Sequence, residues 1–155
     1  MPQMNKGEKY IFGKSLIQDD LTIYLSSQAV EEYHAGVEGR AYLFTASESA
    51  GGFCVTRRGL LEPSKLGHIL AENPALRDYQ IPEGEFIQFK GRSYCWVAIT
   101  SDGAIQLKPS TLEFLDLEIG MELQAIKSSN IAFTMGAKGP LLEKAKNYAG
   151  EIKVY

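Results

Sequence analysis

The sequence predicts a mostly β protein with short helices, organised as two similar halves that share one core. Its 155 residues fit one compact domain. Several short segments alternate apolar and polar residues, as half-buried strands do. The second half also repeats the pattern of the first at an offset of 80 to 82 residues. Hydrophobic residues make up 45% and charged residues 23% of the chain, which is typical of a folded globular protein.

The repeat is seen in an ordered set of matches, which favours an internal duplication over chance similarity. The matched residues are Ile23 with Ile105, Leu25 with Leu107, Val37 with Ile119, Phe53 with Phe133, Gly59 with Gly139, and Leu60-Leu61-Glu62 with Leu141-Leu142-Glu143. Gly39 lies within one residue of the match to Gly120. We therefore divide the chain into a first repeat (1–71), a connector with two prolines (72–84) and a second repeat (85–155), all within one compact unit.

In the first half, the apolar pattern predicts strands at 9–14, 22–25, 41–46 and 52–56. A short helix is expected at 26–34, with Ser26 or Ser27 as its N-cap. The polar turn SESAGG closes a hairpin into the strand at 52–56. A helical segment is expected at 60–73.

The second half follows the same order. Strands are expected at 92–99, 104–107, 122–127 and 131–135. A last strand is expected at 151–155, which corresponds to one at 84–89 that follows the helical segment at 60–73. A short helix is expected at 108–117, with Pro109 in its first turn, and another at 140–148.

Aromatic residues and cysteines in the strands are expected to fill the core. The strand aromatics are Tyr10, Phe12, Tyr42, Phe44, Phe53, Tyr94, Trp96 and Phe133. Cys54 and Cys95 stand singly in apolar runs, so we expect two buried free thiols rather than a disulfide. His34 and His68 have no second ligand at metal-binding spacing, and no serine or paired-carboxylate signature indicates catalysis. The expectation is therefore no metal, no cofactor and no enzymatic activity.

The segment from Asp102 to Ile126 resembles the SpoVT/AbrB swapped-hairpin family, and its tandem organisation is similar to that of the MraZ family. The residues that carry the resemblance are Gly103, Ile105, Leu107, Leu115, Leu117 and Gly120. It covers residues 92–140 well and 8–60 weakly. A double-psi barrel shares much of the same strand and helix pattern and stays open as an alternative topology.

The resemblance implies two pseudo-symmetric AbrB-like repeats that form a swapped-hairpin β-barrel, and a role in binding DNA. The family's DNA-contacting arginines are absent, however. Ala104 and Leu112 stand at those positions in the second repeat, and Thr22 and Val30 stand there in the first. The Asp-x-x-x-Arg signature of MraZ is also missing. The scaffold can be carried over from the family, whereas its DNA-reading residues cannot.

Two basic loops with nearby glycines are the first candidate site for DNA or a small anion. Each loop lies between a predicted strand and a predicted helix, where backbone N–H groups can face an anion. The candidate residues are Arg57, Arg58 and Lys138, with Gly59, Gly136 and Gly139 for loop geometry. The alternative is that the glycines serve only the turn and the cations are solvated. The loop GAKGP lacks the spacing of a P-loop.

A second basic set, Lys14, Arg92 and Lys108, lies near the strand ends that approach DNA in the family. These residues are candidates for phosphate contacts, which position a duplex without reading its sequence. The formal net charge of −3 does not by itself favour a polyanionic partner.

The leading functional hypothesis is a transcriptional-regulator-like DNA-binding protein with degenerate DNA-contact residues. The alternative is a non-enzymatic binding module for a small anion or a protein partner. Double-stranded DNA, a small anion, a protein and a second copy of the chain are the partners considered. The N-terminal residues lack the apolar region of a signal peptide and no apolar run could span a bilayer, so a cytoplasmic location without membrane contact is expected.

Overall fold

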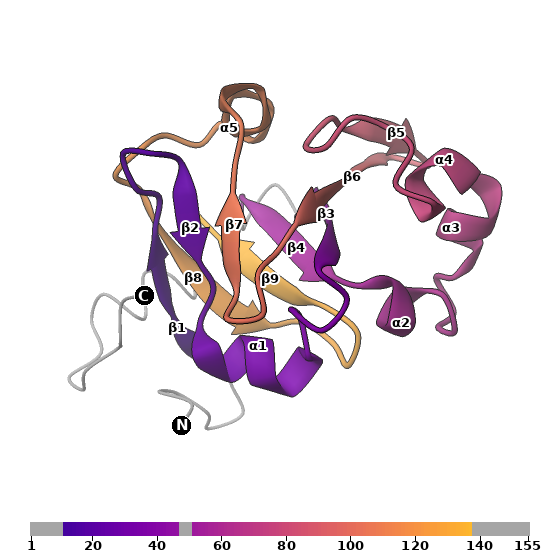
Figure 1. Ribbon diagram of the computed structural model, residues 1–155, viewed down its shortest axis with the longest axis horizontal. Coiled ribbons are helices and arrows are strands. Elements are labelled where there is room, and N and C mark those ends of the chain that lie inside the picture. The colour runs from indigo at the N-terminus through magenta and orange to yellow at the C-terminus, as the bar shows by residue number, and fades with distance from the viewer. Residues whose placement is uncertain (1–10, 47–50, 138–155) are drawn as a thin grey trace.

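The computed structural model describes residues 11–46 and 51–137, which form a mostly β fold with short helices (Figure 1). A seven-stranded antiparallel sheet is accompanied by a separate two-stranded ribbon. The described strands are β1 (Ile11–Leu16), β2 (Thr22–Tyr24), β3 (Arg40–Thr45), β4 (Phe53–Thr56), β5 (Ile87–Phe89), β6 (Arg92–Ala98), β7 (Ala104–Gln106), β8 (Glu122–Lys127) and β9 (Phe133–Gly136). The described helices are α1 (Ser27–Tyr33), α2 (Arg58–Leu61), α3 (His68–Glu72), α4 (Pro74–Arg77) and α5 (Pro109–Leu115).

The strand order of the large sheet has an internal two-fold pattern. The order is β1-β8-β9-β4-β3-β6, followed by β5 at one edge. Exchanging β1, β3 and β4 with β6, β8 and β9 gives the same order read backwards. β1 of the first half therefore pairs with β8 of the second, and the matching strand β6 pairs with β3 of the first.

In two places a strand of one half pairs directly with its own counterpart in the other half. In the ribbon, β2 pairs with β7 so that Ile23 lies opposite Ile105. In the sheet, β4 pairs with β9 so that Cys54 lies opposite Thr134. These residues are 82 and 80 positions apart, the offsets seen in the sequence repeat. We use "matched positions" below for residues related in this way.

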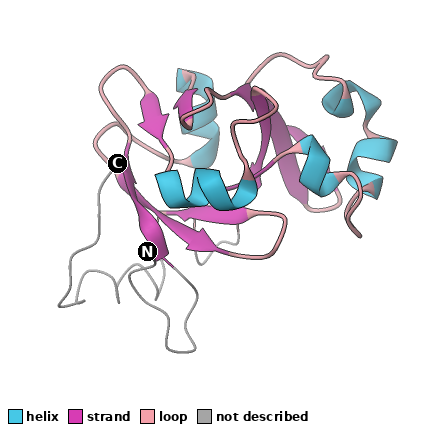
Figure 2. Ribbon diagram, turned by 60° about the horizontal axis from the view of Figure 1, so that its bottom comes forward, coloured by secondary structure: helices cyan, strands magenta, loops and turns pink. Residues whose placement is uncertain are grey.

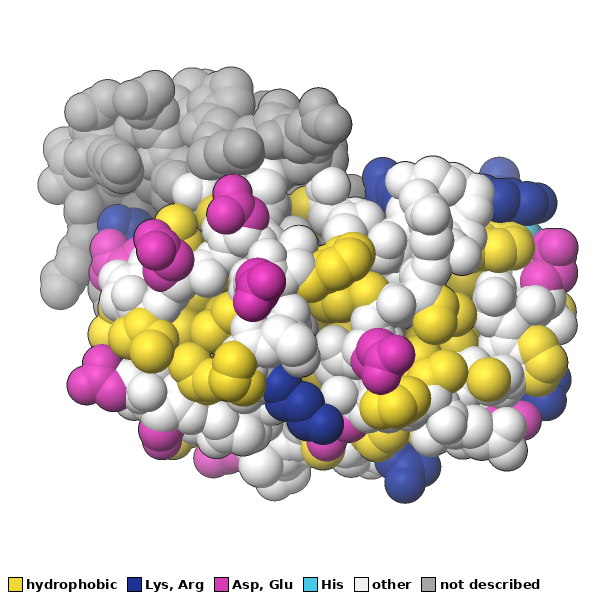
Figure 3. All heavy atoms as spheres, turned by 90° about the horizontal axis from the view of Figure 1, so that it is seen from above, with side chains coloured by type: hydrophobic (Ala, Val, Ile, Leu, Met, Phe, Trp, Pro, Cys, Tyr) yellow, Lys and Arg dark blue, Asp and Glu magenta, His cyan; other side chains and the backbone are white. Residues whose placement is uncertain are grey.

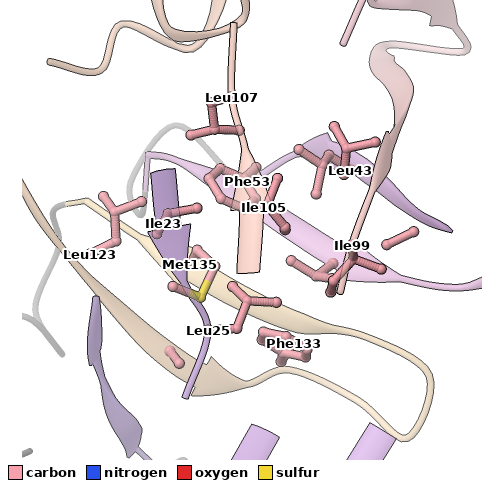
Figure 4. Packing of buried hydrophobic residues seen from close by; sticks show 14 of the residues in the cluster. Ile23, Leu25, Leu43, Phe53, Ile99, Ile105, Leu107, Leu123, Phe133 and Met135 are labelled. Carbon is pink, nitrogen blue, oxygen red and sulfur yellow. The ribbon is translucent and has the colours of Figure 1, made fainter. Parts of the chain in front are cut away.

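The main core lies between the ribbon and the sheet. Figure 4 shows Ile23 and Ile105 of the ribbon facing Phe53, Phe133 and Met135 of the sheet. All five side chains are fully buried. The central pairing of the two halves is therefore also the centre of the apolar core.

A second core cluster lies around α2, α3 and α4, which gather at one end of the molecule (Figure 1). It is built on Tyr42, Phe44 and Tyr94 of the sheet, with Leu70 and Leu76 from the helices. Trp96 packs at its edge and donates a hydrogen bond from Nε1 to the Ile81 carbonyl oxygen at 2.7 Å. This cluster has no counterpart among the described residues of the second half.

The short helices lie around the strands (Figure 2). The predicted strand at 122–127 is confirmed with the same bounds. Ser26 is the N-cap residue of α1 as expected, but its hydroxyl donates to the Phe12 carbonyl oxygen and does not cap the helix. The predicted helical segment at 60–73 is instead two short helices, because Pro63 has no backbone N–H with which to continue α2, and residues 62–67 form a turn. The turn is tight at its end, where a Cβ at Gly67 would lie 2.1 Å from the Glu62 carbonyl oxygen.

The segment at 72–84, expected to connect the two halves, contains α4. Leu76 of this helix is fully buried in the second cluster. The segments predicted at 140–148 and 151–155 lie outside the described residues, as does Tyr10.

Both cysteines are buried thiols that form no disulfide with each other, as the sequence predicts. Burial raises the pKa of the Cys95 thiol to about 12, so the thiol stays protonated at neutral pH. Because a thiolate is the reactive form, Cys95 acts as a small apolar core residue.

Candidate functional site

The loop from β4 to α2 carries the first candidate residues, and a carboxylate of the same chain already occupies it. Arg57 Nη1 lies 2.7 Å from Glu38 Oε2, and Arg57 Nε donates to the Tyr33 carbonyl oxygen at 2.9 Å. The backbone N–H of Gly59 donates to the same Glu38 oxygen at 2.8 Å. The Glu38 carboxylate thus accepts hydrogen bonds from a guanidinium and from a backbone N–H at the start of α2, the two kinds of donor predicted to face an anion.

The contact between Arg57 and Glu38 passes so close to position 59 that it requires a residue without a Cβ there. A Cβ at position 59 would lie 2.3 Å from Arg57 Nη1 and 2.9 Å from Glu38 Oε2. The strand-to-helix turn expected at Gly59 is present, since Arg57 is the N-cap residue of α2. An external anion could reach these donors only by displacing Glu38.

The matching loop is only partly described. Gly136 is buried at the end of β9, opposite Gln124 of β8. Lys138 and Gly139 lie outside the described residues, so the expected pairing of Arg58 with Lys138 stays a prediction.

Arg58 lies in a mixed-charge group on the surface, with its side chain 37% exposed. Its nearest carboxylate atoms are Glu62 Oε2 at 3.5 Å and Asp78 Oδ1 at 3.9 Å. Asp78 also receives two hydrogen bonds of 3.0 Å from Arg77, and Arg77 holds the pKa of this carboxyl below its usual value. The two arginines and two acids make this surface close to neutral.

The second basic set is not brought together. Lys14 is half-buried on β1 and Arg92 is exposed at the start of β6, and β8, β9, β4 and β3 separate these strands in the sheet. The Arg92 guanidinium lies 5.6 Å from the centre of the Phe44 ring. Lys108 is exposed at the N-cap position of α5. On the face shown in Figure 3, basic side chains are scattered and do not form a continuous band.

An open groove of about 760 Å³ lies beside α5 and the turn between β1 and β2. We call it the α5 groove. Its apolar lining includes Leu21, Leu112, Leu117 and Ile119. Leu112 and Leu117 are buried, whereas Ile119 is 50% exposed and so offers apolar surface to a ligand.

Four exposed carboxylates also line the α5 groove, those of Asp19, Glu113, Asp116 and Glu118. None of them forms an ion pair with another residue in 11–46 or 51–137. Asp116 is the C-cap residue of α5, and the last turn of this helix contains no basic residue. Acidic groups at a helix C-terminus face the negative end of the helix dipole, so local helix stability does not explain them.

A smaller groove of about 250 Å³ lies beside α1 and is lined by Val30, Glu31, His34, Gly36, Val37 and Ser101. We call it the α1 groove. Each of these residues is 82 positions from a lining residue of the α5 groove, for example Val37 from Ile119 and His34 from Asp116. His34 and Asp116 are both C-cap residues in the left-handed conformation, with φ of 51° and 58°.

Backbone hydrogen bonds also recur around the two grooves. Leu25 N–H donates to the Gly103 carbonyl oxygen, and Leu107 N–H donates to the Leu21 carbonyl oxygen, both at 2.9 Å. The grooves are therefore two versions of one structural feature. Their main chemical difference is charge, since Ser101, His34 and Gly36 replace three of the four carboxylates.

Sequence reasoning missed both grooves. The match of Val37 with Ile119 contains one residue from each groove, but in the sequence alone it indicates only the repeat. Apolar residues just after a short helix usually indicate packing, and only the structure shows that Val37 is 70% and Ile119 is 50% exposed.

The described residues contain no group of three His, Cys, Asp or Glu side chains placed to hold a metal ion. No helix within 11–46 and 51–137 is long and apolar enough to cross a membrane. Comparison with known proteins finds no family model and no curated protein that matches the chain.

Proposed function

We propose that this protein is a non-enzymatic binding module whose ligand is another protein, bound at the α5 groove. The observation that carries the proposal is the combination of half-exposed apolar surface at Ile119 with exposed carboxylates around it. Protein interfaces combine an apolar centre with a polar rim in the same way. The groove volume of about 760 Å³ is enough for a few side chains of a partner.

The charges of the described surface favour a protein over DNA. Arg57 is neutralised by Glu38, and Arg58 lies among Glu62, Asp78 and Arg77. The α5 groove itself is acidic and repels a phosphate backbone, whereas DNA binding draws its affinity from paired phosphates and cations. A small anion at the Arg57 loop competes with Glu38 for the same donors.

We expect Ile119→Ser to weaken the binding of peptides selected on this protein. A random peptide library is selected on the wild-type chain, and the enriched peptides are measured by fluorescence anisotropy. Loss of the apolar surface at Ile119 should weaken groove ligands about tenfold or more, which corresponds to about 1.4 kcal/mol. Val37→Ser at the matched position of the α1 groove is the control and should leave their affinity unchanged. Failure to enrich any Ile119-dependent peptide contradicts the proposal.

DNA binding on an AbrB-like scaffold is the second candidate. The supporting observation is the strand order, in which β1 pairs with β8 and the matching strand β6 pairs with β3, as would be expected of two interlocked swapped-hairpin repeats. Arg58, Lys14, Arg92, Lys108 and Lys138 are then the phosphate contacts. This candidate predicts binding to a random duplex pool at low salt, weakened steeply by added salt and by the double change of Arg58 and Lys138 to Ala. No duplex binding at low salt rejects it.

A further inference from the structure

We infer that the segment bound in the α5 groove is cationic as well as apolar: a short stretch of a partner protein in which lysine or arginine residues flank aliphatic ones. This inference rests on the proposed function and specifies the chemistry of its partner. It assigns the occupant from charge complementarity and from a comparison of the two matched grooves.

The apolar part of the assignment comes from the lining of the groove. Leu21, Leu112 and Leu117 line the groove, but Leu112 and Leu117 are buried, so the accessible aliphatic surface comes from half-exposed Ile119 and partly buried Leu21. Aliphatic side chains of a partner gain by leaving water in such a place. A purely hydrophilic basic segment would leave the exposed side chain of Ile119 without an apolar contact.

The cationic part comes from the four exposed carboxylates around this surface. Asp19 approaches from the β1–β2 turn, whereas Glu113, Asp116 and Glu118 belong to α5 and the residues after it. Within the described residues no cation pairs with them, so no described cation competes with those of a ligand. Lysine and arginine suit this site because their aliphatic stems pack on apolar surface while their charged ends reach carboxylates.

The α1 groove shows that the charge is not a by-product of the fold. The same backbone arrangement there carries a single carboxylate, Glu31, together with His34, Gly36 and Ser101. The fold therefore does not need acids at these positions. Because the charged version occurs only beside α5, we expect one basic segment per chain rather than two.

A second copy of the chain is a poorer occupant. The chain has a net charge of −3, and two copies that met through this face would bring carboxylates together. Figure 3 shows the side of the molecule on which α5 lies, where acidic side chains are spread among exposed hydrophobic ones.

The test uses three labelled synthetic peptides of about 14 residues and the full chain. The first places leucines at helical spacing with lysines between them, the second replaces every lysine by glutamate, and the third scrambles the first so that no apolar face forms. Anisotropy titrations are run with wild type, with Ile119→Ser, and with the isosteric set Asp19→Asn, Glu113→Gln, Asp116→Asn and Glu118→Gln. Glu31→Gln with Val37→Ser in the α1 groove is the matched control.

We expect the lysine–leucine peptide to bind wild type with 1:1 stoichiometry and to bind the control equally well. Affinity should fall about tenfold or more in Ile119→Ser and in the charge-neutral set, and added salt should weaken binding to wild type. The glutamate peptide should not bind, and the scrambled peptide should bind about tenfold more weakly than the first. Because all altered side chains are exposed, circular dichroism and thermal unfolding of the variants should match wild type.

Several outcomes overturn the inference. These are no binding of the lysine–leucine peptide, equal binding of the scrambled peptide, or binding that neither set of groove substitutions changes. Dimerisation of the wild-type chain in sedimentation experiments that Ile119→Ser abolishes identifies a second copy as the occupant and also overturns it. If library selection enriches Ile119-dependent peptides without lysine or arginine, the protein-binding proposal stands and only the cationic assignment fails. If selection enriches none, both fail.

Discussion

Phe133→Ala is expected to lower the free energy of unfolding by about 3–5 kcal/mol, the usual cost of truncating a fully buried aromatic residue. Phe133 is fully buried in β9 at the centre of the main core. Its ring centre lies 5.1 Å from that of Tyr33 and 6.4 Å from that of Phe12. The alanine variant leaves a cavity bounded by both halves of the chain, so we expect it to weaken the whole domain. Urea unfolding followed by tryptophan fluorescence and circular dichroism measures the loss.

Phe53→Ala at the matched position of β4 is the comparison. Phe53 is also fully buried, so it should lose a similar amount of burial energy. Among the described residues it has no ring partner like those of Phe133, which contacts Phe12 edge-to-face and Tyr33 at a tilt; an aromatic pair of this kind is worth about 0.5–1.5 kcal/mol more. We therefore expect Phe133→Ala to be the more destabilising of the two. A loss below about 1.5 kcal/mol for both variants, or two separate unfolding transitions, contradicts a single core shared by the halves.

The strands could be predicted from the sequence because their signal is local. Alternation of apolar and polar residues in ELQAIK gave the bounds of β8, and the aromatic run after Arg92 gave the body of β6. The repeat offset could be read because buried core positions such as Phe53 and Phe133 kept their residue type. Pro109 marked the start of α5 by its fixed backbone angle.

The site could be predicted much less well, because its determinants are distant in sequence. Nothing in the residues near Arg57 indicates that Glu38, 19 positions away, neutralises it. Asp19 and Leu21 come beside α5 only because β2 pairs with β7. Exposure at Ile119 likewise depends on which segments happen to cover it. Local pattern therefore predicts elements and core, whereas charge balance and grooves follow from tertiary pairing.

Glu38→Ala is expected to lower the free energy of unfolding by about 2–3 kcal/mol. The change removes the carboxylate from Arg57 and from the Gly59 N–H, while Arg57 stays held by the Tyr33 carbonyl oxygen. Loss of one partner from a buried ion pair costs about 3–5 kcal/mol. The expected loss here is smaller because the Arg57 and Glu38 side chains keep 16% and 24% of their exposure to water. Urea unfolding at neutral pH measures it.

A double-mutant cycle separates the pair from simple truncation. Arg57→Met should also be destabilising, since it leaves the Glu38 carboxylate without its cation. The double variant Glu38→Ala, Arg57→Met should lose less than the sum of the two single losses, because no unpaired charge remains. Strict additivity contradicts an energetic coupling between these two side chains.

Glu38→Ala also tests whether the loop from β4 to α2 can bind an external anion. In wild type, the Glu38 carboxylate fills the position that an anion would take between Arg57 and the Gly59 N–H. If the loop is suited to anions in general, inorganic phosphate should stabilise Glu38→Ala by mass action and leave wild type unchanged. If phosphate stabilises neither protein, the loop is shaped for the internal carboxylate alone, and Gly59 serves only to admit it. If phosphate stabilises wild type as much as the variant, it binds elsewhere, and the other cationic positions become the better candidates for an anion site.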